Sequence, residues 1–131
     1  MFDILGPEAR LLLEIALMAA DLGRFSSAAK ILAALEAFRP AHASLAVANA
    51  MLLMRRGEMG EAVEYIDRKA LPANPGSAML MAFKGMALLE CGRRRDALGA
   101  LEEAAKSVAD PAAAKMAKDL INDRCNGFGR G

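Results

Sequence analysis

The side chains that could take part in chemistry are few in this chain of 131 residues. His42 is the only histidine, and it has no partner for catalysis or metal binding in its local sequence. Cys91 and Cys125 lack a neighbouring Cys or His at ligand spacing, and two cysteines do not make a disulfide framework. We therefore expect a solvated histidine at a helix start and thiols that are buried or spare.

Acidic residues and glycines add no catalytic motif to this short inventory. Asp96, Glu102 and Glu103 fall on one expected helix, and no second acid or base is implied near them. The scattered glycines, including Gly129 and Gly131 near the end, do not form a phosphate-binding loop. The sequence thus predicts a protein that is not an enzyme and that has no cofactor or metal.

Composition indicates a helical fold. Hydrophobic residues make up 55% of the chain and aromatic residues 5%, so Leu, Ala, Met, Ile and Val supply most of the apolar surface. No segment alternates apolar and polar residues as a strand would. We therefore predict an all-α fold.

Charge and hydropathy argue against two classes of partner. The net charge of +1 gives no general attraction to nucleic acid or to an anionic membrane. No segment approaches the ~20 uninterrupted apolar residues that a membrane span requires. Glu8, Arg10 and Glu14 interrupt the first apolar stretch, which is not expected to be a signal peptide. A cytoplasmic location is the expectation.

A pattern that repeats about every 34 residues organises the chain. Its glycines lie 34 and then 35 residues apart, and an alanine follows each of them five positions later. A glycine adopts the positive φ that ends a helix, and a small alanine lets the next helix cross the first closely. Three helical hairpins are therefore predicted. Their glycines and alanines are Gly23 and Ala28, Gly57 and Ala62, and Gly92 and Ala97.

The second helix of each predicted hairpin has further inward positions, four and seven residues after the alanine. These positions hold Leu32 and Leu35, Ile66 and Lys69, and Leu101 and Ala104. Lys69 alone departs from the apolar pattern. The second helices are expected to end near Pro40, Pro75 and Pro111, because proline blocks continuation of a helix and suits the start of the next one.

These signals predict one domain over residues 1–125. Its repeats are expected at about 9–42, 43–76 and 78–111. The helices are expected over 7–22, 26–38, 42–56, 59–70, 75–91, 94–107 and 111–125. The last helix is apolar on one side and polar on the other, as a capping helix should be, and residues 126–131 are expected to form a flexible tail.

The repeat resembles the tetratricopeptide repeat, which has Gly at the inter-helix turn, an aromatic residue two positions later, a small Ala and a closing Pro. Residues 9–42 match at all four positions, whereas Met59 and Arg94 replace the aromatic residue, Phe25, in the later repeats. The resemblance implies three hairpins stacked as a right-handed superhelix, whose first helices line a concave groove.

The resemblance also implies which side chains face that groove. Carried over to this sequence, the apolar lining consists of Leu13, Leu17, Val47, Met51, Met54, Met79, Ala82, Met86 and Leu89. Charges are expected only at the rim, as Arg10, Asp21, Arg55 and Glu90. A groove rich in methionine suits an amphipathic helix, because Met adapts its three rotors to an irregular partner.

Two further segments resemble the small tetratricopeptide chaperones and Hrp-type proteins of bacterial type III secretion systems. These segments are Leu35 to Pro40 followed by Leu45, and Met54 to Gly57 followed by Ala62. That resemblance implies a cytosolic chaperone that holds an amphipathic helix of a needle-type or other secretion subunit, with a second small co-chaperone at the N-terminal hairpin. The turn of Arg93, Arg94 and Arg95 has no match in it.

Other roles stay open at this point. The chain could be a scaffold or assembly adaptor, or a homo-oligomeric interaction protein without a secreted cargo. The groove could be filled by a partner, by a second copy in a homodimer, or by the chain's own terminus.

Overall fold

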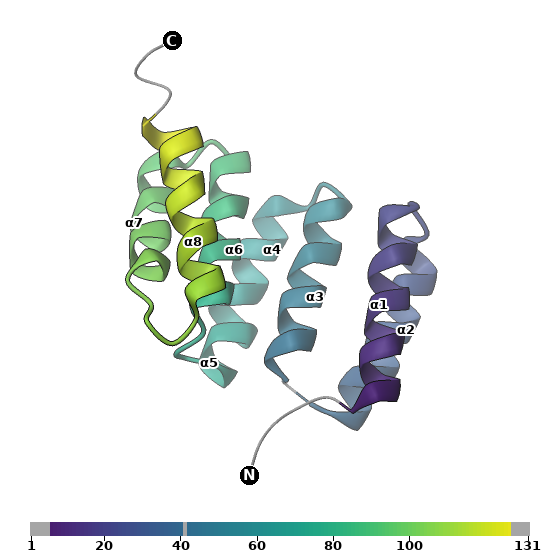
Figure 1. Ribbon diagram of the computed structural model, residues 1–131. Coiled ribbons are helices and arrows are strands. Elements are labelled where there is room, and N and C mark those ends of the chain that lie inside the picture. The colour runs from purple at the N-terminus through teal and green to yellow at the C-terminus, as the bar shows by residue number, and fades with distance from the viewer. Residues whose placement is uncertain (1–5, 41, 127–131) are drawn as a thin grey trace.

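The computed structural model describes residues 6–40 and 42–126, and every regular element in these ranges is a helix. The prediction of an all-α fold is therefore confirmed (Figure 1). Most of the predicted flexible tail, residues 127–131, lies outside the described residues. The elements in chain order are α1 (Pro7–Asp21), α2 (Phe25–Phe38), α3 (Ala43–Arg55), α4 (Met59–Tyr65), η1 (Ile66–Ala70), α5 (Leu71–Ala73), α6 (Ala78–Glu90), α7 (Arg94–Ala105), α8 (Pro111–Leu120) and η2 (Ile121–Asn126).

Neighbouring helices pack in a regular order along the chain. α1 packs against α2 and α3, α3 packs against α4 and α6, and α6 packs against α7 and α8. Three helices, α1, α3 and α6, are thus neighbours in that order, as Figure 1 shows. Core side chains between them are small, with Ala16, Ala48 and Ala50 at most 2% exposed. Small side chains at these contacts allow the helix axes to approach closely.

The three predicted turns have the same backbone geometry. Gly23, Gly57 and Gly92 have φ values of 81°, 81° and 80°. The residue after each glycine donates its backbone N–H to a carbonyl five residues back, for example from Arg93 to Leu88 over 2.9 Å. Such a bond, with a left-handed glycine, closes the C-terminus of a helix. The alanines five residues after the glycines are fully buried, so the predicted pattern of turn and contact is confirmed.

Gly57→Ala should lower the free energy of unfolding by about 1 kcal/mol, because a Cβ atom strains a backbone with positive φ. Space is not the cause, since nothing lies within 4 Å of the added Cβ. Gly60→Ala is the matched control, because Gly60 lies inside α4 with equally open space and without a positive φ. Urea unfolding should show a loss for the first variant and none for the second. Equal effects of the two would contradict this explanation.

Gly57 and Gly92 are 35 residues apart, one more than Gly23 and Gly57, and a π-turn accommodates this extra residue. Within η1 the helix widens, and Leu71 donates its backbone N–H to the carbonyl of Ile66, five residues back. Ala70, 2% exposed, therefore takes the buried place that the repeat pattern assigns to Lys69, whose side chain is exposed. The inward position expected for Lys69 was wrong because a π-turn shifts all later residues by one position.

Three helix boundaries differ from the predicted ones by more than one residue. The fourth predicted helix continues through η1 to Ala73 instead of ending at residue 70. α6 begins at Ala78 instead of residue 75, because the Ser77 hydroxyl accepts the backbone N–H of Leu80 over 3.2 Å and so caps the helix there. α7 ends at Ala105, two residues earlier than expected.

The C-terminal helix is amphipathic, as expected. Ala113, Ala114 and Ala117 of α8 are buried, whereas Lys115 and Lys118 are exposed. α8 packs against both α6 and α7. The Asp110 carboxylate accepts the backbone N–H of Ala113 over 3.0 Å and caps the start of this helix.

Candidate functional site

An apolar cavity opens between α1, α3 and the start of α6. Its volume is about 380 Å³. It brings together five of the nine predicted groove residues, which come from three different helices. They are Leu13 and Leu17 of α1, Val47 and Met51 of α3, and Met79 of α6. The remaining lining residues are Ala43, Ser44, Ala48, Ser77 and Asp110. We call this feature the apolar cavity.

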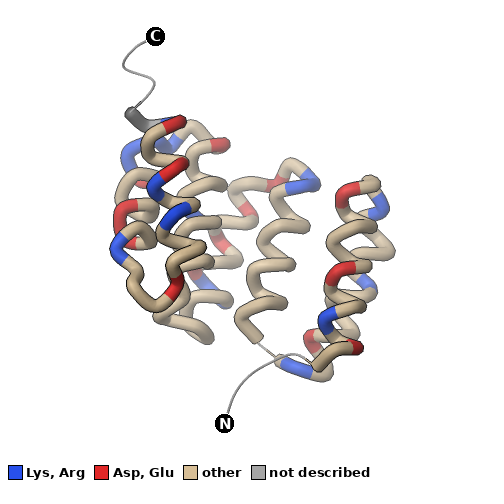
Figure 2. The backbone as a smooth tube through the Cα atoms, in the orientation of Figure 1, with Lys and Arg blue, Asp and Glu red and all other residues tan. Residues whose placement is uncertain are grey.

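Helix α3 supplies half of the lining residues and carries no charge along the cavity. Residues 43–54 contain no Asp, Glu, Lys or Arg, and Figure 2 shows α3 without charge up to its last turn. Ser77 and Asp110 are engaged in capping α6 and α8. The side chains of Leu13, Val47 and Met51 are half-buried and make up an apolar wall. This wall can contact apolar side chains and offers little for catalysis.

The predicted groove is shorter than expected, because α8 packs against α6. Ala82 and Leu89 are 0% and 9% exposed and belong to a core cluster that includes Ala117 of α8. Neither residue lines the apolar cavity, so the structure does not bring these two predicted residues into the groove. Met54 packs half-buried against the same cluster, and Met86 is half-buried outside the apolar cavity.

The predicted rim charges are exposed, and three of them have ion-pair partners. Arg55 and Asp21 form an ion pair of 2.6 Å that joins the ends of α3 and α1, with about half of each side chain exposed. Glu90 of α6 lies 3.2 Å from Arg124 of η2. The sequence analysis did not predict this contact of Arg124, because it identified the last helix as a cap without assigning partners to its charged side chains. Arg10 is exposed on α1.

A second apolar surface lies on the outer side of α1, which we call the α1 end face. It consists of Leu11, Leu12, Ile15, Met18 and Leu22, which are 43–73% exposed. Four of them follow a spacing of four, three and four residues, which forms one stripe along a helix. The buried residues of α1, Ala9, Ala16 and Ala20, lie on its other side. Contiguous exposed apolar side chains of this kind make the α1 end face a candidate interaction surface.

The single histidine is a cap and is not solvated. His42 is 5% exposed, and its Nδ1 atom accepts the backbone N–H of Ser44 over 3.0 Å at the start of α3. The prediction of a helix-start residue is confirmed, but the prediction of solvation was wrong. The sequence shows no local partner for this ring, and so its burial was not predicted.

The other candidate chemical groups lie apart from the apolar cavity. Cys91 is an exposed free thiol, and the side chain of Cys125 lies outside the described part. Asp96 pairs with Arg93 over 2.7 Å, and Glu103 pairs with Lys106 over 3.1 Å. Within residues 6–40 and 42–126, no three Cys, His, Asp or Glu side chains are grouped as a metal site would need. None of the described helices combines the length and the apolarity needed to cross a membrane.

Comparison with known proteins does not assign the chain to a family. No family model matches it, and no curated protein matches it. Any functional conclusion therefore depends on the residues and surfaces described above.

Proposed function

We propose that this chain is a tetratricopeptide-type, non-catalytic protein-binding module that holds an amphipathic helix in its apolar cavity. The three glycine turns with equal φ and the three fully buried alanines support the repeat type. In this proposal the helix pairs form the turns of a right-handed superhelix, with α8 as the cap. The single observation that supports binding most directly is the uncharged wall of Leu13, Val47 and Met51 on two neighbouring helices, α1 and α3.

The energetics of such binding are favourable. A helix that covers about 300 Å² of apolar surface gains roughly 8 kcal/mol from the hydrophobic effect. The loss of translational freedom and the ordering of the helix offset several kcal/mol of that gain. The rim charges, Asp21 and Arg55, lie one helical turn beyond the lining residues Leu17 and Met51. Charged residues that flank the bound helix would interact with them and so favour one direction of that helix.

We propose further that the bound helix belongs to a needle-type or other subunit of a type III secretion system, and that the protein is its cytosolic chaperone. The segments that carry this resemblance lie at the end of α2, where Arg39 precedes Pro40, and at the turn of Gly57. A subunit that self-assembles through an amphipathic helix needs that helix masked before export. The uncharged lining of the apolar cavity supports this proposal, because an amphipathic helix docks by its apolar face.

Co-expression with candidate secretion subunits tests this proposal. We expect the subunit to co-purify at a ratio of 1:1, or of 1:1:1 when a co-chaperone is present, and to precipitate when expressed alone. Genes for secretion-apparatus parts beside the gene for this chain would identify the candidates. A subunit that stays insoluble or unbound in the presence of the chain would contradict the chaperone function.

The α1 end face supports a second partner at the first helix pair, which would be the small co-chaperone. At the other end of the chain α8 covers the last pair with a polar outer surface, whereas the stripe of Leu11, Ile15 and Met18 has no such cover among the described residues. Terminal repeats need a polar outer face. A partner helix on this stripe would supply one.

Ile15→Glu combined with Met18→Glu should reduce self-association of the purified protein. In the absence of a partner, the α1 end face should associate with itself, because five large apolar side chains face water there. Light scattering at increasing concentration measures the effect, and circular dichroism checks that the fold is kept. If the double variant scatters as strongly as the parent protein, the end face is not an interaction surface.

The second candidate function is a scaffold or homodimeric adaptor without a secreted cargo. The α1 end face is the observation that favours it, since two copies can pair through one stripe. A stable homodimer in which the apolar cavity is also buried would support this function. A monomer that aggregates alone and is rescued by a partner would support the chaperone.

A further inference from the structure

A second cavity, of about 430 Å³, is lined by residues of α4, η1, α6 and α7. Helix α6 contributes Met81, Lys84 and Leu88, which are three and four residues apart and therefore lie on one side of that helix. Met79 lies on the other side of α6 and lines the apolar cavity. The second cavity brings together five charged side chains, and we call it the charged cavity.

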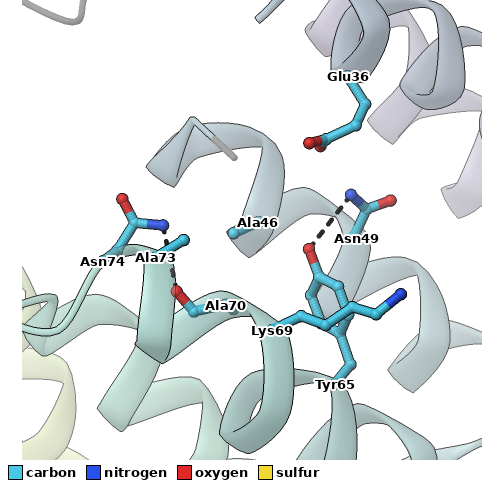
Figure 3. Close-up of a pocket in the computed structure, with 8 residues that line it drawn as sticks. All are labelled: Glu36, Ala46, Asn49, Tyr65, Lys69, Ala70, Ala73 and Asn74. Atoms are coloured by element: carbon cyan, nitrogen blue, oxygen red, sulfur yellow. Dashed lines mark hydrogen bonds between the residues drawn. The ribbon is translucent and has the colours of Figure 1, made fainter. Parts of the chain in front are cut away.

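The charged cavity has a counterpart one repeat earlier, which Figure 3 shows. In that cavity Asn49 of α3 donates its side-chain Nδ2 group to the Tyr65 hydroxyl over 3.4 Å. Lys84 lies 35 residues after Asn49, at the equivalent position of α6, and its ammonium pairs with the Asp67 carboxylate over 2.8 Å. In both cavities the polar group at this position is therefore engaged within the protein.

Four of the five charged side chains in the charged cavity are paired with one another. Lys84 pairs with Asp67, and the Arg93 guanidinium donates from Nη2 and Nε to one carboxylate oxygen of Asp96, over 2.7 and 3.1 Å. Arg95 is the fifth, and its side chain forms no hydrogen bond or ion pair within residues 6–40 and 42–126. The charged cavity thus has one positive charge that no carboxylate of its lining neutralises.

Gly99 leaves open the place where a helical partner of Arg95 would lie. Residues four apart are neighbours on the surface of a helix, and a carboxylate at that spacing commonly pairs with an arginine. The equivalent position carries the long side chains of Lys30 and Glu64 in the first two hairpins. Gly99 has no side chain, and nothing lies within 4 Å of a Cβ atom placed on it. The helix surface beside Arg95 is therefore accessible to a carboxylate from outside the chain.

We propose that the charged cavity binds an acidic side chain, glutamate or aspartate, of a partner polypeptide. Its carboxylate would accept hydrogen bonds from Arg95 in the space beside Gly99, because a guanidinium presents two parallel N–H groups that match a carboxylate. Its methylene stem would lie against the apolar part of the lining, such as Ala100. The negative charges of Asp67 and Asp96 disfavour a ligand with more than one negative charge, such as a phosphate. This inference concerns the other side of α6 from the apolar cavity and does not depend on the proposed chaperone function.

NMR titration of the full chain with capped single amino acids tests the proposal. The probes are N-acetyl-glutamate methylamide and N-acetyl-aspartate methylamide, with the glutamine and asparagine analogues as uncharged controls of nearly equal shape. We expect saturable shifts of the Arg95 Nε–H and the Gly99 backbone N–H with at least one acidic probe, in the millimolar range. Inorganic phosphate, titrated in parallel, should bind less tightly. No shift with either acidic probe, equal shifts with the uncharged controls, or tighter binding of phosphate would overturn the proposal.

Arg95→Gln should weaken binding of the acidic probes by about fivefold, because it removes the charge that would attract the carboxylate. The fold should be kept, as circular dichroism can check, since the Arg95 side chain is exposed. Arg24→Gln is the matched control and should bind as the parent does, because Arg24 is exposed at the turn of the first hairpin and does not line the charged cavity. Gly99→Glu should also prevent binding, because it places a carboxylate of the chain itself four residues from Arg95. If either Arg95→Gln or Gly99→Glu binds the acidic probes as the parent does, the charged cavity does not recognise a carboxylate.

Discussion

Met51→Glu should abolish binding of an amphipathic helix to the apolar cavity while the protein keeps its fold. Met51 lies near the middle of the uncharged stretch of α3 and is half-buried in the cavity wall. A bound helix would bury the new carboxylate against Leu17 and Val47 without a partner. Burial of an unpaired charge costs several kcal/mol, so we expect affinity to fall at least about a hundredfold.

The fold should survive this substitution for three reasons. In the absence of a partner the carboxylate reaches solvent through the open cavity, and Glu and Met have similar helix propensity. Met51 is also not a fully buried member of the core clusters. Thermal unfolding of the variant should therefore resemble that of the parent protein.

Two control variants locate the effect. Met51→Leu keeps an apolar side chain of similar volume and should bind the helix within a few-fold of the parent. Met18→Glu places the same new charge on the α1 end face, where Met18 is 63% exposed, and should leave helix binding in the apolar cavity unchanged. Calorimetry with the purified subunit, or with a peptide of its amphipathic helix, compares the three variants. A Met51→Glu protein that binds normally would mean that the helix docks elsewhere.

Local chemistry made much of the fold predictable from the sequence. A glycine with positive φ, an alanine five residues later and a proline before the next pair each have a short-range physical cause, so their positions identify turns and contacts. The structure follows them at Gly23, Gly57 and Gly92. Five of the nine predicted groove residues also lie together in one cavity, because α1 and α3 are neighbours and present these side chains to the same side.

Long-range packing explains what the sequence did not reveal. The apolar side of α8 was recognised, but amphipathicity does not tell which neighbours a helix meets, so the burial of Ala82 and Leu89 was missed. α1 is apolar on most of its surface, and its periodicity could not separate the core side from the end face. His42 shows the same difficulty, because its local sequence does not reveal that the folded chain buries it.

One error had a signal in the sequence. The second glycine interval is one residue longer than the first, and Lys69 breaks the apolar pattern within it. Together these two facts indicate an inserted residue, which a π-turn accommodates without breaking the helix. The structure has this turn at η1, and the residue after Lys69 is the buried one.

Gly85→Ala should destabilise the protein by about 2 kcal/mol, although alanine is the better helix former. Gly85 lies inside α6, where alanine gains about 1 kcal/mol from helix propensity. The added Cβ would lie 2.5 Å from Cγ of Leu101 and 3.3 Å from the carbonyl oxygen of Ala97. Leu101 is fully buried between α6 and α7, and its Cγ atom is too close to its backbone to move away. With so close an approach we expect an overpacking cost of about 3 kcal/mol, at the upper end of the usual range, which exceeds the gain in propensity by about 2 kcal/mol.

A comparison of four variants by urea unfolding decides between overpacking and other causes. Gly99→Ala is the matched control, because Gly99 lies in α7 with nothing within 4 Å of an added Cβ, and it should stabilise the protein by up to about 1 kcal/mol. Leu101→Ala alone should cost about 2–5 kcal/mol by leaving a cavity. In the double variant Gly85→Ala with Leu101→Ala, the new methyl group occupies part of that cavity, so the loss should be smaller than the sum of the two single losses by at least about 1 kcal/mol. Additive losses would show that the close approach of α6 and α7 at Gly85 does not limit the size of residue 85.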